Sequence, residues 1–351
     1  MVFLFFHCGY TLSSWDYFIV TGVFFALSWL HRQLRIYFEH GIGNRGTLTL
    51  TPNGFVCVKV PTQAVWHVGQ HFFVRFMTLG VHVATIHPFT ACSLPSQTSE
   101  KSELVFYIRP RGGLTSRLAR QAATRPASSV RVLLDGPYGG ISFERIQQCQ
   151  RQIVIAGGSG AGWVLPMFLA CLRSNDLANQ KGQSKIASTM RIVLATRDST
   201  TQAWFEQCLR ELLSERGLEK LPHGIEVELH YTGYEDTTRA PQATSESLNT
   251  IQDPEKALSK MLSTTASDSD SGVASASKGN MLECFDERPD LPALVQAEIA
   301  SAPNNEQLGV FVCGPLSMQS DVSNTVALAQ LEVMKGARKD IYLHMEHFSW
   351  A

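Results

Sequence analysis

Residues 151–162 read RQIVIAGGSGAG, and this stretch decides the fold of the second half of the chain. Its apolar, β-branched run predicts a buried strand, and the glycines predict a sharp turn into the apolar helix that follows. Because glycine has no Cβ, a pyrophosphate can approach the backbone of such a turn and meet the unpaired N–H groups of the helix N-terminus. On this stretch alone, a tight turn without a ligand remains an open alternative.

Strands and helices alternate from this turn to the C-terminus. Helical stretches separate further predicted strands, which are RIVLATRD (191–198), GIEVELHYTG (224–233), LGVFVCGP (308–315) and IYLHMEHF (341–348). The alternation predicts an α/β domain with a doubly wound parallel sheet. Ligands of such sheets bind beyond the carboxyl ends of the strands, so we expect one cleft between the glycine turn and residues 313–315.

The part before residue 148 has a different pattern. Between residues 46 and 135, runs with period-two alternation, such as ELVFYIRP (103–110), are separated by turn residues, which predicts an antiparallel β-barrel or sandwich. We assign residues 41–148 to this barrel and residues 149–351 to the α/β domain. A Ser- and Thr-rich segment at about residues 237–282 has almost no aromatic residues and is predicted to be a disordered insertion.

The front of the chain is apolar and is assigned, over residues 1–40, to membrane segments. It has no Lys or Arg before Arg32, and residues 17–30 read YFIVTGVFFALSWL. This run is shorter than the roughly 20 residues that cross a bilayer, but flanking aromatic and arginine residues extend the predicted span to about residues 15–36. Arg32 and Arg35 then place the rest of the chain on the cytoplasmic side. The alternatives are a buried core helix and a signal peptide, although the positive n-region of a signal peptide is absent.

Composition excludes other classes of function. The chain has 351 residues, with 30 Lys and Arg against 31 Asp and Glu, and its formal net charge is -1. A protein that binds nucleic acid through a broad basic face needs a surplus of cations, so this class is excluded. The cysteines are scattered without a C-x-x-C pair, which predicts reduced thiols and neither a disulfide framework nor a metal site.

Six short motifs follow one another along the chain. They are HPFT (His87–Thr90), GPYG (Gly136–Gly139), the glycine turn with Leu165-Pro166, RPD (Arg288–Asp290), CGP (Cys313–Pro315) and FSW (Phe348–Trp350). In this order, from about residue 13 to the end, the chain resembles the fungal-type ferric reductases and the NADPH oxidases. The resemblance implies a ferredoxin-reductase-like fold, in which a β-barrel binds FAD and an α/β domain binds NADPH.

The resemblance also implies which residues bind FAD. The HPFT strand would lie along the flavin and its ribityl chain, with a serine just beyond, and an arginine and a helix N-terminus would face the pyrophosphate. A planar aromatic group suits an isoalloxazine, and a guanidinium beside a helix N-terminus suits an anion. The implied FAD residues are His87, Pro88, Phe89, Thr90, Ser93, Arg109, Gly113 and Thr115.

NADPH is expected at the glycine turn and at the CGP motif. The implied residues are Gly157, Gly158, Ser159, Gly160, Gly162, Gly314 and Pro315. Arg197 follows a strand where such folds distinguish a ribose with a 2′-phosphate, and Arg288 matches the family's second arginine on the adenine side. The two arginines favour NADPH over NADH, although Asp198 weakens the argument by its charge. Glu287, before Arg288, replaces a glycine of the family pattern.

Two further residues are assigned to the transfer of electrons. Cys313 matches the family's cysteine beside the nicotinamide, which helps to place that ring for hydride transfer. Trp350 resembles the C-terminal aromatic residue that covers the flavin, although here Ala351 follows it. Complete ferric reductases carry four haem-binding histidines on two membrane helices, whereas this chain has only His7 ahead of its predicted span. Haem is therefore expected only from upstream helices or from a partner.

These assignments predict a membrane-anchored flavin reductase that passes electrons from NADPH through FAD to haem and ferric iron, as a ferric-chelate reductase does. An integral membrane location, with the reductase domains on the cytoplasmic side, and a haem-bearing membrane partner belong to this prediction. One alternative is a cytochrome b5 reductase-like flavoprotein that serves a separate acceptor. Another is a non-catalytic, truncated membrane subunit.

Overall fold

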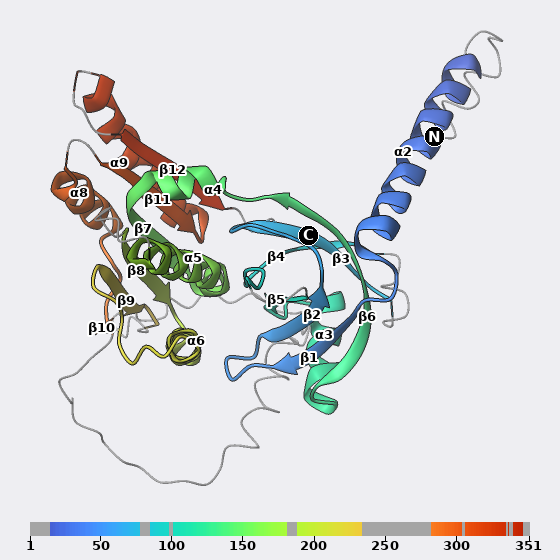
Figure 1. Cartoon of the computed structure of the whole chain (residues 1–351), viewed down its shortest axis with the longest axis horizontal. Coiled ribbons are helices and arrows are strands. Elements are labelled where there is room, and N and C mark those ends of the chain that lie inside the picture. Colours follow the sequence, from blue (N-terminus) through green and yellow to red (C-terminus); the bar gives the residue numbers. More distant parts are fainter. Residues whose placement is uncertain are drawn as a thin grey trace, which may run out of the picture.

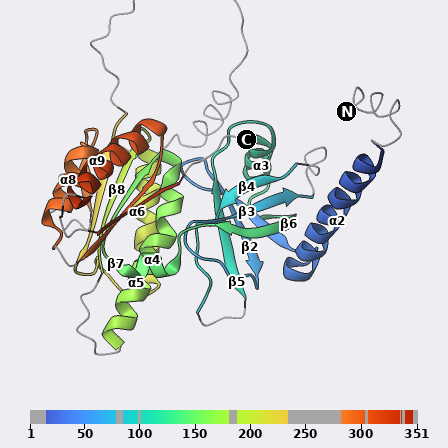
Figure 2. The same ribbon diagram turned by 90° about the horizontal axis from the view of Figure 1, so that it is seen from above.

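The computed structural model describes residues 15–77, 85–97, 101–180, 188–233, 282–303, 306–334, 336 and 340–346. They form two six-stranded sheets, one antiparallel and one parallel, that lie side by side (Figure 1). A long helix, α2 (Trp15–His40), lies on the side of the antiparallel sheet remote from the parallel sheet (Figure 2). The predicted combination of an antiparallel sheet with a parallel α/β domain is thereby confirmed.

The antiparallel sheet consists of strands from the first half of the chain. They are β1 (Arg45–Leu50), β2 (Val56–Thr62), β3 (Gln70–Phe76), β4 (His87–Thr90), β5 (Ser102–Ile108) and β6 (Ser128–Gly139), in the spatial order β4-β3-β6-β1-β2-β5. β6 pairs with β1 over its first residues and with β3 over the rest, so the sheet curls around one core. Alternating side chains such as Val58, Phe72 and Phe106 are fully buried there, and helix α3 (Gly113–Thr124) adds Leu114 and Leu118.

All neighbouring strands of the second sheet pair in parallel. They are β7 (Cys149–Gly157), β8 (Thr189–Thr196), β9 (Ile225–Tyr231), β10 (Glu283–Phe285), β11 (Gln307–Cys313) and β12 (Asp340–Glu346), in the order β10-β9-β8-β7-β11-β12. The short helix α4 (Phe143–Gln148) leads into this sheet, and the 3-10 turn η3 (Gly158–Gly160) leaves β7.

Helices cover both faces of the parallel sheet, as its double winding requires. Helices α5 (Ala161–Gln180) and α6 (Ser199–Ser214) share one apolar core with the sheet, and α8 (Leu291–Ser301) and α9 (Leu316–Met334) share another. Successive residues of β7, such as Val154 and Ile155, belong to opposite cores and are both fully buried. This explains why the strands read as continuous apolar runs rather than as alternating ones.

Helix α2 requires a correction of the membrane prediction. Within the described part of the chain, no helix combines the length and the apolar content that crossing a membrane demands. The apolar run Tyr17–Leu30 is shorter than the roughly 20 residues of a span. The helix then continues into Arg32 and Arg35, which bind Asp135 of β6. The span predicted over about residues 15–36 is therefore not supported, and the second half of α2 docks on the antiparallel sheet instead.

Several predicted features lie outside the described residues. They include the insertion at about residues 237–282, except for the buried Leu282, and also His7 and Trp350. The strands of the antiparallel sheet fall within residues 45–139 and those of the parallel sheet within residues 149–346. The domain limits at residues 40 and 148 stay predictions.

Candidate functional site

The candidate site lies at the carboxyl edge of the parallel sheet. Because its strands run in one direction, the residues that follow them gather at one edge. The chain reverses its course across the sheet at β7, since β8 and β9 lie on one side of it and β11 lies on the other. This is a topological switch point, the place where doubly wound sheets bind their ligands.

The residues predicted to bind NADPH follow one another along this edge. Arg288 comes after β10, Arg197 after β8, Gly157 ends β7 and Cys313 ends β11. Adjacent strands lie about 4.8 Å apart, so the series extends over roughly 20 Å. An elongated ligand can therefore extend along the whole series.

The turn between β7 and α5 is packed against the turn that follows β11. A Cβ at Gly157 would lie 2.8 Å from Cδ of Pro315, and a Cβ at Gly160 would lie 2.6 Å from the carbonyl oxygen of Cys313. Gly158 differs, because its φ is +51° and nothing lies within 4 Å of its Cβ position. The turn is thus closed on its inner side and open on its outer side. Its backbone and the N-terminus of α5 fit the requirements of a pyrophosphate site.

Cys313 lies beneath the glycine turn. Its side chain is fully buried, and burial together with the nearby Glu346 and Cys92 raises the pKa of its thiol. The thiol is therefore protonated at neutral pH and is not a nucleophile. Sequence reasoning missed Gln319, whose amide donates to the carbonyl oxygens of Gly314 (2.8 Å) and Glu346 (3.0 Å). These bonds tie the turn after β11 to the end of β12.

Arg197 and Arg288 are both exposed at the other end of the edge. One strand separates β8 from β10, so the strands that precede the two arginines lie about 10 Å apart. Asp198 caps helix α6, because its carboxylate accepts from the N–H of Thr200 (3.0 Å) and the hydroxyl of Thr201 (2.8 Å). The helix N-terminus partly balances that charge, which weakens the objection that Asp198 raised to a cationic pair.

Glu287 stands where the family pattern has glycine, and this substitution fits the local backbone. Among the described residues, Ala127 is the non-glycine residue with positive φ, so Glu287 does not adopt a conformation that needs glycine. Its side chain is exposed.

The aromatic ring of the HPFT motif points into the antiparallel sheet. The ring of Phe89 contacts those of Phe76 and Phe106, with centroids 6.4 and 6.2 Å apart. Successive side chains of a strand alternate, so Pro88 and Thr90 face the opposite side. Phe89 thus supports β4 from within, and the backbone with Pro88 and Thr90 remains for a ligand.

Two other residues predicted to bind FAD make hydrogen bonds within the protein. The hydroxyl of Ser93 donates to the carbonyl oxygen of Glu103 (2.8 Å) and accepts from the N–H of Val105 (3.0 Å). Nε2 of His87 lies 3.1 Å from the hydroxyl of Thr85. Ser93 therefore fastens the segment after β4 to β5.

The N-terminus of α3 follows an exposed arginine, Arg109, at the end of β5. Gly113 begins the helix with φ +51° and is exposed, so its backbone is accessible to an anion. The hydroxyl of Thr115 accepts from the N–H groups of Arg111 (2.9 Å) and Gly112 (3.3 Å). Arg109 and Gly113 fit the pyrophosphate site that sequence reasoning predicts, whereas Thr115 shapes the loop.

The two domains meet where α5 begins. A Cβ at Gly162 would lie 3.1 Å from Sγ of Cys92 and 3.3 Å from Cδ2 of Tyr107. The ring of Trp204 on α6 contacts Tyr107 (4.8 Å between centroids) and Phe55 (5.8 Å). The glycine turn and the segment after the HPFT strand therefore share one interdomain boundary. Sequence reasoning missed Cys92, Tyr107 and Trp204, because no motif marks them.

Asp135, which directly precedes the GPYG motif, forms a second cluster at the base of α2. Its carboxylate accepts from Arg32 (2.6 Å), Arg35 (2.7 Å) and the hydroxyl of Tyr138 (2.6 Å). Burial tends to raise the pKa of this carboxyl, but the bonds from Tyr138, Arg32 and Arg35 outweigh burial and hold that pKa below its ordinary value. Asp135 is therefore ionised at neutral pH and fastens α2 to β6.

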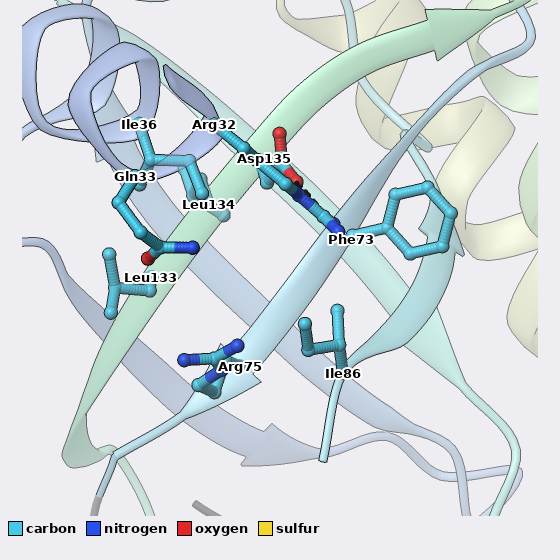
Figure 3. A pocket seen from close by; sticks show the side chains of 9 residues that line it. All are labelled: Arg32, Gln33, Ile36, Phe73, Arg75, Ile86, Leu133, Leu134 and Asp135. Carbon is cyan, nitrogen blue, oxygen red and sulfur yellow. Dashed lines mark hydrogen bonds and ion pairs between the residues drawn. The ribbon is translucent and has the colours of Figure 1, made fainter. Parts of the chain in front are cut away.

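A small cavity adjoins this cluster between α2, β3 and β6 (Figure 3). Its volume is about 20 Å³, and its walls include Gln33, Phe73 and Arg75. A cavity of this size holds about one water molecule. It belongs to the contact between helix and sheet and is far too small for either cofactor.

Two family models match the chain. One, described as a ferric reductase NAD binding domain, matches residues 151–327, and the other, described as an FAD-binding domain, matches residues 45–142. The chain belongs to the ferric reductase family. The antiparallel sheet of this family member lies in the FAD-binding domain, and the glycine turn lies in the NAD-binding domain.

Curated relatives of this family member carry related names. A probable cell surface ferric reductase (kap2) of Aspergillus oryzae is 28% identical over 223 residues, which cover 60% of this chain and 29% of the relative. A probable ferric reductase transmembrane component of Candida albicans is 21% identical over 320 residues, which cover 88% and 41%. NADPH oxidase 1 of Rattus norvegicus is 28% identical over 170 residues, which cover 48% and 28%. The chain thus spans 41% or less of the length of these three relatives.

Among solved structures, a ferredoxin NADP+ reductase from Neisseria gonorrhoeae with bound FAD and NADP is similar to this family member. The TM-score is 0.48 and the identity is 12%, with coverage of 86% of this chain and 97% of that chain.

Proposed function

We propose that this chain carries the reductase domains of a ferric-reductase-like flavoenzyme, which oxidises NADPH and passes the electrons through FAD to haem and ferric iron. The contact of Gly162 with Cys92 and Tyr107 carries this proposal, because it joins the edges where the two cofactors are expected. When bound, NADPH supplies a hydride, and FAD accepts it and passes electrons on singly.

Residues of the α/β domain bind and orient the dinucleotide in this proposal. The open side of Gly157–Gly160 and the N-terminus of α5 bind its pyrophosphate. Arg197 and Arg288 pair with the 2′-phosphate, a contact that NADH cannot make. Cys313, whose neighbour Gly314 is held by Gln319, supports the nicotinamide end, and its protonated thiol places no negative charge there.

Residues of the barrel bind FAD and exclude water. Arg109 and the N-terminus of α3 bind the FAD pyrophosphate, while β4 lies along the flavin with Pro88 and Thr90 facing it. Cys92 and Tyr107 close the boundary with α5, so that water is kept from the place where the two cofactors meet. Trp350 remains our candidate for covering the flavin.

The electron acceptors and the membrane location are proposed from the relatives. Names such as cell surface ferric reductase and ferric reductase transmembrane component support ferric iron as the acceptor and a membrane setting for this chain. Haem is then supplied by a haem-bearing membrane partner. The exposed apolar side chains of α2, such as Phe24 and Phe25 at 67% and 73% exposure, offer a surface for membrane association. The reductase domains would face the cytoplasm.

Anaerobic mixing of the full, detergent-solubilised and FAD-loaded chain with NADPH or NADH tests the proposal. Below saturation, we expect NADPH to bleach the flavin absorbance about tenfold or more faster than NADH. The reason is that only NADPH has the 2′-phosphate with which the two arginines pair. The double variant Arg197→Ala, Arg288→Ala removes this difference. Arg210→Ala, which changes an exposed arginine of α6, retains it.

A chain that does not retain FAD, or whose flavin is not bleached by either nucleotide, contradicts the proposed function. Faster bleaching by NADH contradicts the assignment of the two arginines alone. If a haem protein is reduced while a ferric chelate is not, the flavoprotein serves a separate acceptor.

A further inference from the structure

His230 is a buried residue of β9 that none of the cofactor assignments uses. It is 5% exposed, and its ring stacks on that of Phe285 in β10, with centroids 4.7 Å apart and an interplanar angle of 12°. Nδ1 lies 3.1 Å from the carbonyl oxygen of Glu287. Since a carbonyl oxygen only accepts, this hydrogen bond places a proton on Nδ1. His230 therefore contacts β10 at the ring of Phe285 and the segment after β10 at the backbone of Glu287.

Arg288 directly follows the backbone group that His230 binds. On its other side, Pro289 is buried, and Asp290 caps α8 by accepting from the N–H of Ala293 at 3.0 Å. Arg288 is thus an exposed arginine between two anchored neighbours. A guanidinium on a fixed backbone loses less conformational freedom when it pairs with a phosphate, so anchoring of this kind raises affinity.

A chain of ion pairs holds the opposite side of the imidazole. Nε2 of His230 lies 3.5 Å from Glu228, which accepts from Arg191 at 2.7 Å. Arg191 and Arg151 both bind Glu298 of α8, at 3.0 and 2.9 Å. Burial tends to raise the pKa of Glu228, but the bonds from His230 and Arg191 outweigh burial and lower that pKa. Glu228 is therefore ionised at neutral pH and stays paired with Arg191, with Nε2 of His230 3.5 Å away.

These ion pairs differ from the apolar core that α8 and α9 share with the parallel sheet. An apolar cluster of similar volume often stabilises a protein as well or better, because buried charges cost desolvation free energy. What the ion pairs supply is a defined orientation of the imidazole, with Nδ1 directed at Glu287. The arrangement thus extends from α8 through β8 and β9 to the backbone that presents Arg288.

We propose that His230 is a positioning residue for the 2′-phosphate of NADPH: through the carbonyl group of Glu287 it sets the position of Arg288 and so determines the preference for a phosphorylated ribose. The inference rests on the proposed NADPH site. It adds a specificity-determining residue that does not itself touch the nucleotide.

Calorimetric titration of the FAD-loaded chain with adenosine 2′,5′-bisphosphate and with 5′-AMP tests this role. His230→Asn leaves a side-chain amide near the position of Nδ1, whereas His230→Gln moves the amide to the position of Nε2. We expect His230→Asn to retain the preference for the bisphosphate. We expect His230→Gln to bind the bisphosphate about 10- to 100-fold more weakly, with little change for 5′-AMP, since one charge-assisted contact is lost. His223→Gln, at an exposed site before β9, serves as the control and retains the preference.

A double-mutant cycle with Arg288→Ala shows whether His230 acts through that arginine. If it does, His230→Gln has no further effect once Arg288 is replaced. Should His230→Gln lose FAD or cooperative unfolding, His230→Phe keeps the stack on Phe285 and is expected to lose the preference in the same way.

The outcomes separate this inference from the function on which it rests. A wild-type chain that binds both nucleotides equally overturns the proposed NADPH preference and the role of His230 with it. If the preference of the wild-type chain persists in His230→Gln, the role of His230 alone is overturned. The same holds if the effects of His230→Gln and Arg288→Ala add up in the double variant.

Discussion

Asp135 connects helix α2 to the antiparallel sheet, and its neutralisation should loosen the helix. Its side chain is 5% exposed and accepts from two arginines and a tyrosine. We expect Asp135→Asn to reduce protection from hydrogen exchange over residues 31–40 at pH 7. The loss should be about 1–2 kcal/mol, toward the low end for charged hydrogen bonds because Arg32 is 43% exposed. Glu39→Gln, which changes an exposed partner of Arg35 at 3.8 Å, is the control and should have little effect.

The same carboxylate also predicts a dependence on pH. Because the pKa of Asp135 is lowered in the folded chain, its stabilising contribution is fully present above the unfolded value of about 3.9. It is lost as the pH falls through the folded value. The difference between the wild-type chain and Asp135→Asn should therefore shrink below about pH 4. A constant difference down to pH 2, or none at pH 7, would contradict this account.

At the scale of elements, the turn between β7 and α5 depends on the absence of a side chain. Gly160→Ala would place a methyl group 2.6 Å from the carbonyl oxygen of Cys313, so one of the two turns must move. We expect a loss of about 1–3 kcal/mol in the free energy of unfolding by urea, together with weaker NADPH binding. Gly43→Ala, in open space, is the matched control. Unchanged NADPH affinity in Gly160→Ala would show that the turn does not bind the nucleotide.

The whole molecule depends on how its two domains are held together. Trp204 is 4% exposed and contacts Tyr107 and Phe55 across the boundary. We expect Trp204→Ala to cost roughly 2–4 kcal/mol and to slow flavin bleaching by NADPH while FAD remains bound, since the cofactors lose their relative orientation. Calorimetric unfolding and stopped-flow absorbance measure the two effects. Leu328→Ala, on an exposed face of α9, should alter neither. Normal bleaching by Trp204→Ala would exclude this boundary from the transfer.

Residues with a local signal could be assigned from the sequence. The glycines of residues 157–162 mark a turn because their backbone requirement is local, and Arg197 marks a strand end because a polar residue follows an apolar run. His230 and Trp204 carry no such signal. Their partners, Glu287 and Tyr107, are distant along the chain, so neither periodicity nor spacing indicates the contact. The membrane span is not supported for a related reason: Arg32 and Arg35 fit a membrane interface in the sequence, whereas in the structure both bind Asp135.

The sequence by itself determined the two sheets, their parallel or antiparallel character and the glycine turn at the switch point, because each follows from side-chain periodicity or backbone freedom within a few residues. Only the tertiary structure decided that Gly162 meets Cys92 and Tyr107, that Asp135 binds α2 and that His230 holds the backbone next to Arg288. Such contacts arise from close packing of surfaces whose residues come from distant parts of the chain, and no short segment encodes them.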